Sequence, residues 1–328
     1  MPREEISSIT ERPELRASAA SHRGADSGSE TIRSRDNRRL KAFRAALRGG
    51  GPASDEPIAV EGPKLVEDGL RVGLELQGLL VSETGEKSLE RIFAAARESE
   101  EGISRSRIFR TTDKLFAGVA GTETPQGVAA LFRQREWAFD NVLRGAALPD
   151  GSYRGNAPMV IVLAGVQDPG NVGTILRSAE AFGATGLITT RGTADPWSPK
   201  AVRASAGSAL RLPLLRGMAP SVVLTQLRVA KLRIYAAVSG MENGHEGENR
   251  DRNDAKKDIT SGILGANLAD RCAILIGSEG HGLAAELERS ADAILSVPII
   301  EQVDSLNAAV AASVLLYEAA RQRRAATQ

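Results

Sequence analysis

Two ends of apolar runs and one helix start carry glycine, proline, serine and asparagine. Residues 305–307 (SLN) open a helix of small residues, residues 277–282 (GSEGHG) follow one apolar run, and Pro298 closes the next. In open α/β sheets, ligands bind outside the carboxyl ends of the strands, where glycines let a ligand approach the backbone. We therefore expect a ligand site where these segments meet, although the same residues can serve only as a helix cap and chain turns.

The order of the glycines narrows the kind of ligand. Gly277, Gly280 and Gly282 are spaced G-x-x-G-x-G. The dinucleotide-binding fingerprint is instead G-x-G-x-x-G, followed by an acidic residue that binds the ribose. This order disfavours a nucleotide-dependent oxidoreductase.

Composition excludes several classes of protein. The net charge of the 328-residue chain is +1, so attraction to nucleic acid would depend on local patches. The single cysteine, Cys272, excludes an internal disulfide, and the three histidines lack metal-binding spacing, so we expect no metal. No apolar run is long enough for a membrane span and the polar N-terminus lacks a signal-peptide core, so we expect a cytoplasmic protein without membrane contact.

The first part of the chain predicts a tail and a small domain. Residues 1–31 lack apolar periodicity and are expected to be disordered. In the helix that follows, Leu40, Phe43 and Leu47 form one apolar stripe, and the basic remainder either contacts phosphates or is simply solvated. Short strands alternating with helical patterns predict an α/β domain over residues 32–133, and turn residues predict a linker over residues 134–157.

The second domain is expected over residues 158–325. Buried-looking strands alternate with helices there, which predicts an α/β fold with a parallel sheet, interrupted by a flexible polar insertion at residues 242–258. The last helix is expected to begin at Ser305, with Val310, Val314 and Tyr317 on its buried face together with Ser313.

Three motifs together resemble one family. Residues 168–179 (DPGNVGTILRSA), 276–283 (IGSEGHGL), and 297–298 (VP) with 305–311 (SLNAAVA) are similar to the three motifs of the SpoU (TrmH-like) branch of the SPOUT RNA methyltransferases. Residues 34–41, 60–66 and 122–128 resemble the substrate-binding domain that many rRNA-modifying members carry. The resemblance implies a C-terminal trefoil knot, binding of S-adenosylmethionine, and a homodimer formed through the methyltransferase domain. Periodicity alone indicates no knot.

The resemblance also implies roles for particular residues. It assigns main-chain contacts with the cofactor to Gly277, Val297 and Leu306. Further cofactor-binding candidates are Leu275, Gly282 and Ile300. The resemblance assigns the reaction to Arg177, assisted by Asn171, Ser305, Asn307 and Glu279. Because a guanidinium keeps its proton at neutral pH, we expect Arg177 to orient the ribose hydroxyl and stabilise developing negative charge, with proton abstraction as the alternative.

Further residues are candidates for contact with RNA or for a place near the site. The RNA-contact candidates are Arg38, Arg39, Lys41, Lys64 and Arg203. Ser205 belongs to a segment that also resembles a family segment near the active site, whereas His281 is a lone loop histidine and is not expected to act as a base.

The resemblance implies an S-adenosylmethionine-dependent RNA ribose 2'-O-methyltransferase that acts on rRNA. A tRNA substrate is the alternative within this class. A non-catalytic RNA-binding protein of the same fold is the alternative from another class, and the intact set of polar motif residues argues against it.

Overall fold

The computed structural model describes residues 30–49, 51–53, 55–97, 103–104, 107–146, 157–238, 263–300 and 302–326. The expected insertion at residues 242–258 and nearly all of the expected tail lie outside these ranges. The exception is the end of the tail, where Glu30–Thr31 form the short strand β1 and pair with another strand. The expectation of a disordered tail was therefore wrong for these two residues.

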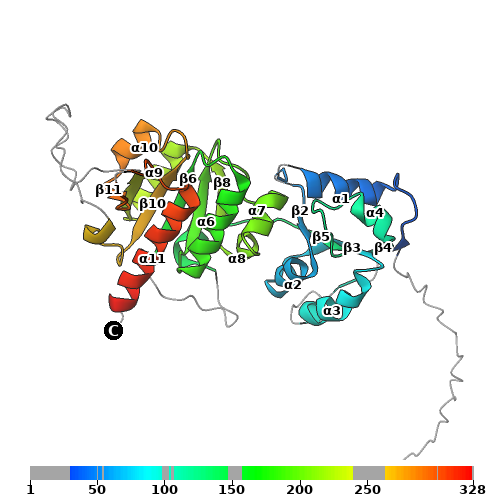
Figure 1. The fold of residues 1–328 in the computed structure, drawn as a ribbon. Coiled ribbons are helices and arrows are strands. Elements are labelled where there is room, and N and C mark those ends of the chain that lie inside the picture. Colours follow the sequence, from blue (N-terminus) through cyan, green and yellow to red (C-terminus); the bar gives the residue numbers. More distant parts are fainter. Residues whose placement is uncertain are drawn as a thin grey trace, which may run out of the picture.

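The first sheet is mixed and has five strands. Their order is β1-β4-β3-β5-β2, where β2 is Ile58–Glu61, β3 is Leu76–Ser82, β4 is Ile108–Thr111 and β5 is Val128–Phe132. Helices α1 (Arg38–Arg48) and α4 (Asp113–Ala117) cover one face, whereas α2 (Pro63–Arg71), the short helix Glu86–Ser88 and α3 (Leu89–Arg97) cover the other (Figure 1).

Helix α1 forms as the sequence predicts. The Asn37 side chain accepts from the backbone amides of Arg39 and Leu40, which caps the helix. Leu40, Phe43 and Leu47 are buried against the sheet, so the apolar stripe is confirmed and the basic side chains remain on the outer face.

The second sheet is entirely parallel and has six strands. Their order is β11-β9-β10-β6-β7-β8, where β6 is Met159–Ala164, β7 is Gly186–Thr190, β8 is Leu214–Met218, β9 is Arg233–Val238, β10 is Cys272–Gly277 and β11 is Ala293–Ser296. The α/β fold class and the parallel sheet are confirmed. The trefoil knot remains a prediction.

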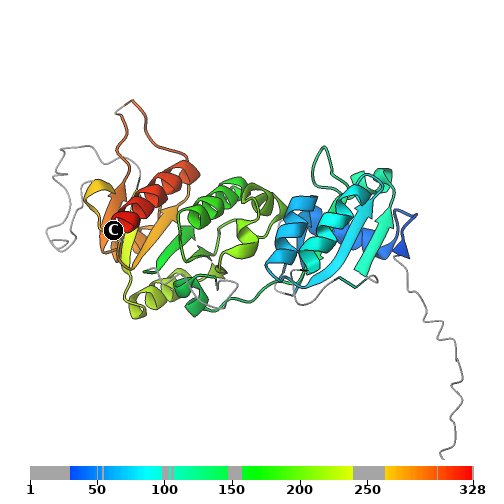
Figure 2. The same cartoon turned by 90° about the horizontal axis from the view of Figure 1, so that it is seen from below.

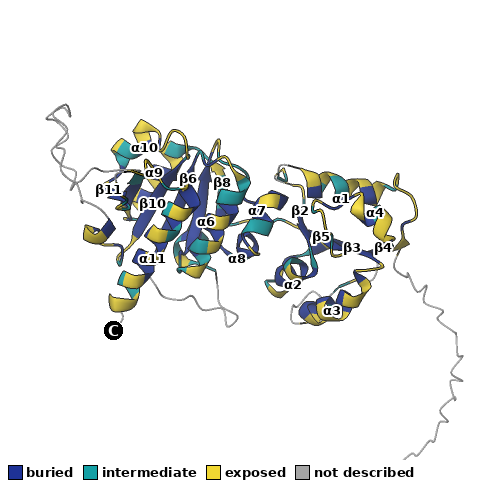
Figure 3. Cartoon of the chain, in the orientation of Figure 1, coloured by how far each residue is buried: buried dark blue, intermediate teal, exposed yellow. Residues whose placement is uncertain are grey.

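Helices cover both faces of this sheet. One face carries α6 (Pro169–Ala181), α7 (Pro199–Ala204), α8 (Ser208–Arg211), the short helix Ile263–Gly265 and α11 (Ala308–Ala326), and the other carries α5 (Phe139–Arg144), α9 (Pro220–Val229) and α10 (Ala285–Ser290) (Figure 2). The strands are buried between these layers, and the exposed residues lie on the outer sides of the helices (Figure 3).

Two elements of the second domain were not expected. Helix α5 lies inside the predicted linker over residues 134–157 and packs on β7, so this part of the segment belongs to the second domain. Strand β8 was missed because it is a half-exposed edge strand that contains Arg216 and Gly217.

The last helix differs from the expectation in two ways. It begins at Ala308 rather than Ser305, because the Asn307 side chain caps it. Its buried apolar residues are Ala308, Ala309, Ala312, Leu315, Leu316, Ala319 and Ala320, and Glu318 is buried as well. Val310, Val314 and Tyr317 are 50%, 38% and 56% exposed, so their assignment to the buried face was wrong.

The two domains lie side by side, with α7 facing β2 of the first sheet (Figure 1). One cluster of buried apolar residues includes members of both sheets. Polar contacts add to it, since the Arg211 guanidinium lies 3.5 Å from the Asp68 carboxylate.

Candidate active site

Helix α6 begins directly beyond the carboxyl end of β6. Asp168 caps it by accepting a hydrogen bond of 2.9 Å from the backbone amide of Asn171, and Pro169 occupies the first turn, where a missing amide hydrogen costs nothing. Lys200 of α7 donates to the Asp168 carboxylate at 2.7 Å. These two hydrogen bonds, that from Lys200 above all, hold the pKa of Asp168 below its ordinary value. The Asp168 carboxylate therefore fixes the position of Asn171.

Asn171 joins three segments that are far apart in the sequence. Its side-chain NH₂ group donates to Glu279 Oε1, and its Oδ1 atom accepts from Asn307 Nδ2 at 3.2 Å. Asn307 Oδ1 in turn accepts from the backbone amides of Ala309 and Val310 at 2.9 and 3.3 Å. The structure thus brings Asn171, Glu279 and Asn307 together as one network.

The glycine loop after β10 folds back tightly on itself. The backbones of Ser278 and Gly282 exchange two hydrogen bonds of 3.0 Å each. A β-carbon on Gly277 would lie 2.2 Å from the carbonyl carbon of Gly282, so no side chain fits there, and Gly282 has a φ of +64°. Gly277 itself is buried under this turn, whereas residues 279–282 are exposed next to the Asn171 network.

Arg177 lies in the third turn of α6, on the exposed side of the helix. Among the described residues its guanidinium has no hydrogen-bond or ion-pair partner. The neighbouring Ser178 shares a 2.7 Å hydrogen bond with Ser313, which fixes α6 against α11. The helix that carries Arg177 is thus held rigidly while the guanidinium itself stays available.

The other candidate cofactor residues fall into two groups. Val297 and Leu306 are half-buried and Ile300 is 68% exposed, all on the segment that joins β11 to α11. Leu275 differs, because its side chain is fully buried and its strand pairs with β6 on one side and β9 on the other. Leu275 is a core residue and offers no free group to a ligand.

Ser305 lies in the same joining segment. It is exposed, and within the described part of the chain its hydroxyl has no hydrogen-bond partner. It does not cap α11, so the capping role expected for it falls to Asn307 alone.

Two residues of the segment before α8 do not face the site as a substrate contact would require. Ser205 is fully buried, donates to the Val202 carbonyl at 2.8 Å and accepts from the Ala209 amide at 3.2 Å, so it shapes the turn. Arg203 points between the domains, toward Gly121 and Glu61, and its buried Nη1 atom has no hydrogen-bond partner among the described residues. Arg203 is therefore an interdomain residue.

The candidate RNA contacts of the first domain are exposed, but most are already paired. Arg39 binds Glu30 at 2.8 Å and stacks 4.3 Å from the Phe109 ring centroid. Lys41 binds Asp36 at 3.1 Å, and Lys64 binds Asp68 at 2.7 Å. Among the described residues Arg38 has no such partner, which leaves it freest to meet a phosphate.

Asp168 binds the Asn171 amide and Lys200 binds Asp168, so both help to position Asn171. The sequence interpretation named neither as a site residue. A signal was present, because an aspartate followed by proline marks the start of a helix. Lys200 gave no such signal, since it reaches Asp168 from a different helix.

No helix among the described residues is both long enough and apolar enough to span a membrane.

This fold occurs in rRNA methyltransferases of known structure. An rRNA methyltransferase from Sinorhizobium meliloti is 25% identical to the chain and superposes with a TM-score of 0.69. The match covers 89% of this chain and 98% of the S. meliloti chain. Its form with bound AdoMet superposes with a TM-score of 0.68.

Family models and relatives identify the chain more closely. Residues 158–317 match the SpoU rRNA Methylase family, and residues 54–130 match the MRM3-like substrate binding domain. A tRNA/rRNA methyltransferase of uncharacterized function from Mycobacterium tuberculosis is 30% identical over 87% of this chain and 80% of its own length. A 23S rRNA (guanosine(2553)-2'-O)-methyltransferase from Bacillus subtilis is 28% identical over 87% of this chain and 97% of its own. The chain belongs to the SpoU rRNA methylase family.

Proposed function

We propose that this protein transfers a methyl group from S-adenosylmethionine to a ribose 2'-hydroxyl of ribosomal RNA. The observation that carries the proposal is the Asn171–Glu279–Asn307 network, which joins all three motifs beside the tight loop at Gly277 and on the helix that bears Arg177. The B. subtilis relative supports both the position of the methyl group and the class of RNA.

The residues present fit S-adenosylmethionine. Residues 279–282 of the loop after β10 are exposed, and the half-buried Val297 and Leu306 lie on the segment before α11. We assign the cofactor contacts to Gly277, Gly282, Val297 and Leu306, with Ile300 at the rim. When bound, S-adenosylmethionine supplies a methyl group on a positively charged sulfur, which a hydroxyl oxygen can attack without any metal.

We assign the activation of the hydroxyl to Arg177. A ribose hydroxyl is a weak nucleophile, and negative charge grows on its oxygen as its proton leaves to solvent. A guanidinium with free N–H donors stabilises that charge and also binds an adjacent phosphate. The Asn171 network holds the start of α6, and Ser305 offers a free hydroxyl to the incoming nucleotide.

We propose a homodimer formed through the second domain. Val310, Val314 and Tyr317 form an exposed apolar stripe along α11. The stripe continues to the end of α6, where the following residue, Phe182, packs edge-on against Tyr317 with ring centroids 5.9 Å apart. Exposed apolar stripes of this kind mark protein interfaces. We also propose that the protein acts in the cytoplasm, where it would meet ribosomal RNA.

The test is methyl transfer with radiolabelled S-adenosylmethionine to purified rRNA and, in parallel, to tRNA. Alkaline cleavage of RNA needs a free 2'-hydroxyl, so we expect the label in alkali-resistant dinucleotides from rRNA. Label in tRNA alone would replace the rRNA substrate with the tRNA alternative. Cofactor binding without any transfer to RNA would contradict the proposed reaction.

A further inference from the structure

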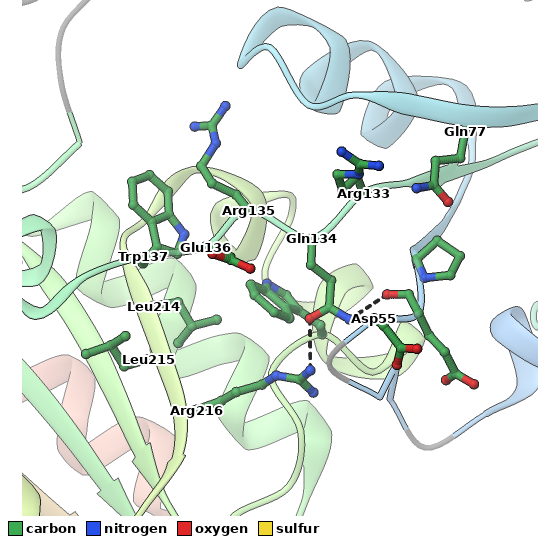
Figure 4. A pocket seen from close by; sticks show the side chains of 13 residues that line it. Asp55, Gln77, Arg133, Gln134, Arg135, Glu136, Trp137, Leu214, Leu215 and Arg216 are labelled. Carbon is green, nitrogen blue, oxygen red and sulfur yellow. Dashed lines mark hydrogen bonds between the residues drawn. The ribbon is translucent and has the colours of Figure 1, made fainter.

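A pocket of about 620 Å³ lies between the two domains, beside the edge strand β8 (Figure 4). Its volume falls within the roughly 300–1,000 Å³ typical of ligand sites. The segment that follows β5 forms one wall, and β8 with the loop before α7 forms the other. The lining residues include Asp55, Gln77, Arg133, Glu136, Trp137 and Arg216.

Both tryptophans of the chain line this pocket. Trp197 is 5% exposed, donates from its indole nitrogen to the Ala209 carbonyl at 3.2 Å, and lies under the Arg216 guanidinium at 5.0 Å. Trp137 is half-buried, with the Arg135 guanidinium 5.2 Å from its ring centroid. Within the described part of the chain its indole N–H has no hydrogen-bond partner, and Trp137 is the more exposed of the two rings.

The floor of the pocket is fixed by Arg216. Its guanidinium donates to the Pro52 carbonyl at 2.6 Å, to Gln134 Oε1 at 2.8 Å and to the Asp195 carboxylate. Gln134 donates in turn to the carbonyls of Ala53 and Glu56. Three of the five N–H donors of Arg216 and both amide N–H donors of Gln134 are thus engaged within the protein, so the pocket keeps its shape without a ligand.

Other polar groups around Trp137 are open. Among the residues that the structure describes, the Asp55 and Glu136 carboxylates and the Gln77 amide have no hydrogen-bond partner. Arg133 forms an ion pair of 3.1 Å with Glu75, and its side chain is 67% exposed, so it stays accessible from solvent. An aromatic face, free acceptors, a free amide and a guanidinium match the flat ring, polar edge and phosphate of one nucleotide.

We propose that this interdomain pocket binds an unpaired nucleotide of the RNA substrate, with the base stacked on Trp137 and the adjacent phosphate beside Arg133. This inference rests on the proposed function. The pocket connects to the reaction side through α7, because Trp197 precedes that helix and Lys200 within it binds Asp168 at the start of α6. The nucleotide in the pocket would therefore set the position of the strand relative to Arg177.

Tryptophan fluorescence tests the pocket directly, since it contains both fluorophores. Single-stranded hexamers of uridylate and of adenylate are titrated into the full-length protein, and binding is also followed by anisotropy of a labelled hexamer. We expect saturable quenching. Trp137→Ala should weaken binding about 5- to 100-fold, whereas Trp137→Phe should abolish most of the quenching yet keep the affinity within about threefold, because phenylalanine still stacks.

Arg133→Ala should weaken binding, whereas the matched control Arg289→Ala, which removes an exposed arginine of α10 far from the pocket, should not. An absence of quenching in the unmodified protein, or unchanged affinity in Trp137→Ala, would overturn the proposal.

The same preparations are assayed for S-adenosylmethionine binding and rRNA methylation. Methylation without quenching rejects the pocket and leaves the proposed function standing, whereas quenching without methylation of any RNA rejects the function.

Discussion

Each sheet places a glycine where another backbone leaves no room for a side chain. A β-carbon on Gly85, after β3, would lie 2.1 Å from the Gly127 carbonyl oxygen, and one on Gly277, the last residue of β10, would lie 2.2 Å from the Gly282 carbonyl carbon. The polar groups nearby are used differently. In the first domain the Asp113 carboxylate accepts from the Ser82 hydroxyl and from both the amide and the hydroxyl of Thr84.

The loop of the first domain is therefore satisfied by its own residues. In the second domain Asn171 and Asn307 bind each other, but Arg177 and Ser305 have no hydrogen-bond partner among the described residues. A close glycine contact by itself indicates only a tight turn. Unpaired polar groups on the motif segments distinguish the second glycine contact from a simple turn.

The largest expected effect concerns Arg177. Arg177→Ala should lower the rate of methyl transfer about 10²- to 10³-fold, because it removes the donor that stabilises the developing charge. Since the side chain is exposed, stability should change by no more than about 0.5 kcal/mol. The measurements are single-turnover methylation, cofactor binding by calorimetry and thermal unfolding. Arg177→Lys tests the geometry, since an ammonium lacks the planar fork and should restore only part of the rate.

Gly277→Ala and Gly85→Ala compare the two loops directly. Each forces a β-carbon into backbone and should cost about 1–3 kcal/mol of unfolding free energy. Only Gly277→Ala should also weaken binding of S-adenosylmethionine, which calorimetry would measure. Equal loss of cofactor affinity in both variants would show that the glycine at 277 acts only through overall stability.

The Asp113 cluster predicts a pH dependence. The Ser82 hydroxyl, followed by the Thr84 amide and hydroxyl, holds the pKa of Asp113 below its ordinary value. A lowered pKa in the folded state stabilises the protein above the unfolded value of about 3.9, and this contribution is lost as the pH falls through the folded pKa.

Asp113→Asn should therefore lower Tm at pH 7, and the difference from the unmodified protein should shrink below about pH 4. Scanning calorimetry across this range measures the difference. Asp140→Asn provides the control, because Asp140 lies in an exposed pair with Arg144 and its loss should matter little at any pH. A difference for Asp113→Asn that does not change with pH would contradict the role of its charge.

The smallest expected effect is on the salt dependence of RNA binding. If Arg38 meets a phosphate, Arg38→Ala should reduce the slope of log K against log salt by about 0.7–0.9. Arg39→Ala should reduce it less, because Arg39 already binds Glu30. Fluorescence anisotropy at several salt concentrations gives these slopes. Identical slopes in the unmodified protein and both variants would indicate that the basic side chains of α1 contact only solvent.

Strand ends and glycine spacing, which are local features, predicted the glycine loop, whereas Asn171 was identified through the resemblance of its motif. The sequence failed for α11, where alanines line one side and Val310, Val314 and Tyr317 the other. A helix that is apolar on all sides gives periodicity no way to choose the buried face. It also could not show that Asn171 binds Glu279, which lies 108 residues further along the chain.

Arg216 limits how the domains can be exchanged between relatives. Its guanidinium binds Pro52 and Gln134 from the first half of the chain and Asp195 from the second. A chimaera whose new substrate-binding domain lacks acceptors equivalent to Pro52 and Gln134 would leave the largely buried Arg216 guanidinium without these hydrogen-bond partners. Successful grafts should therefore transfer the segments around Pro52 and Gln134 together with the domain, or replace Arg216 by an apolar residue.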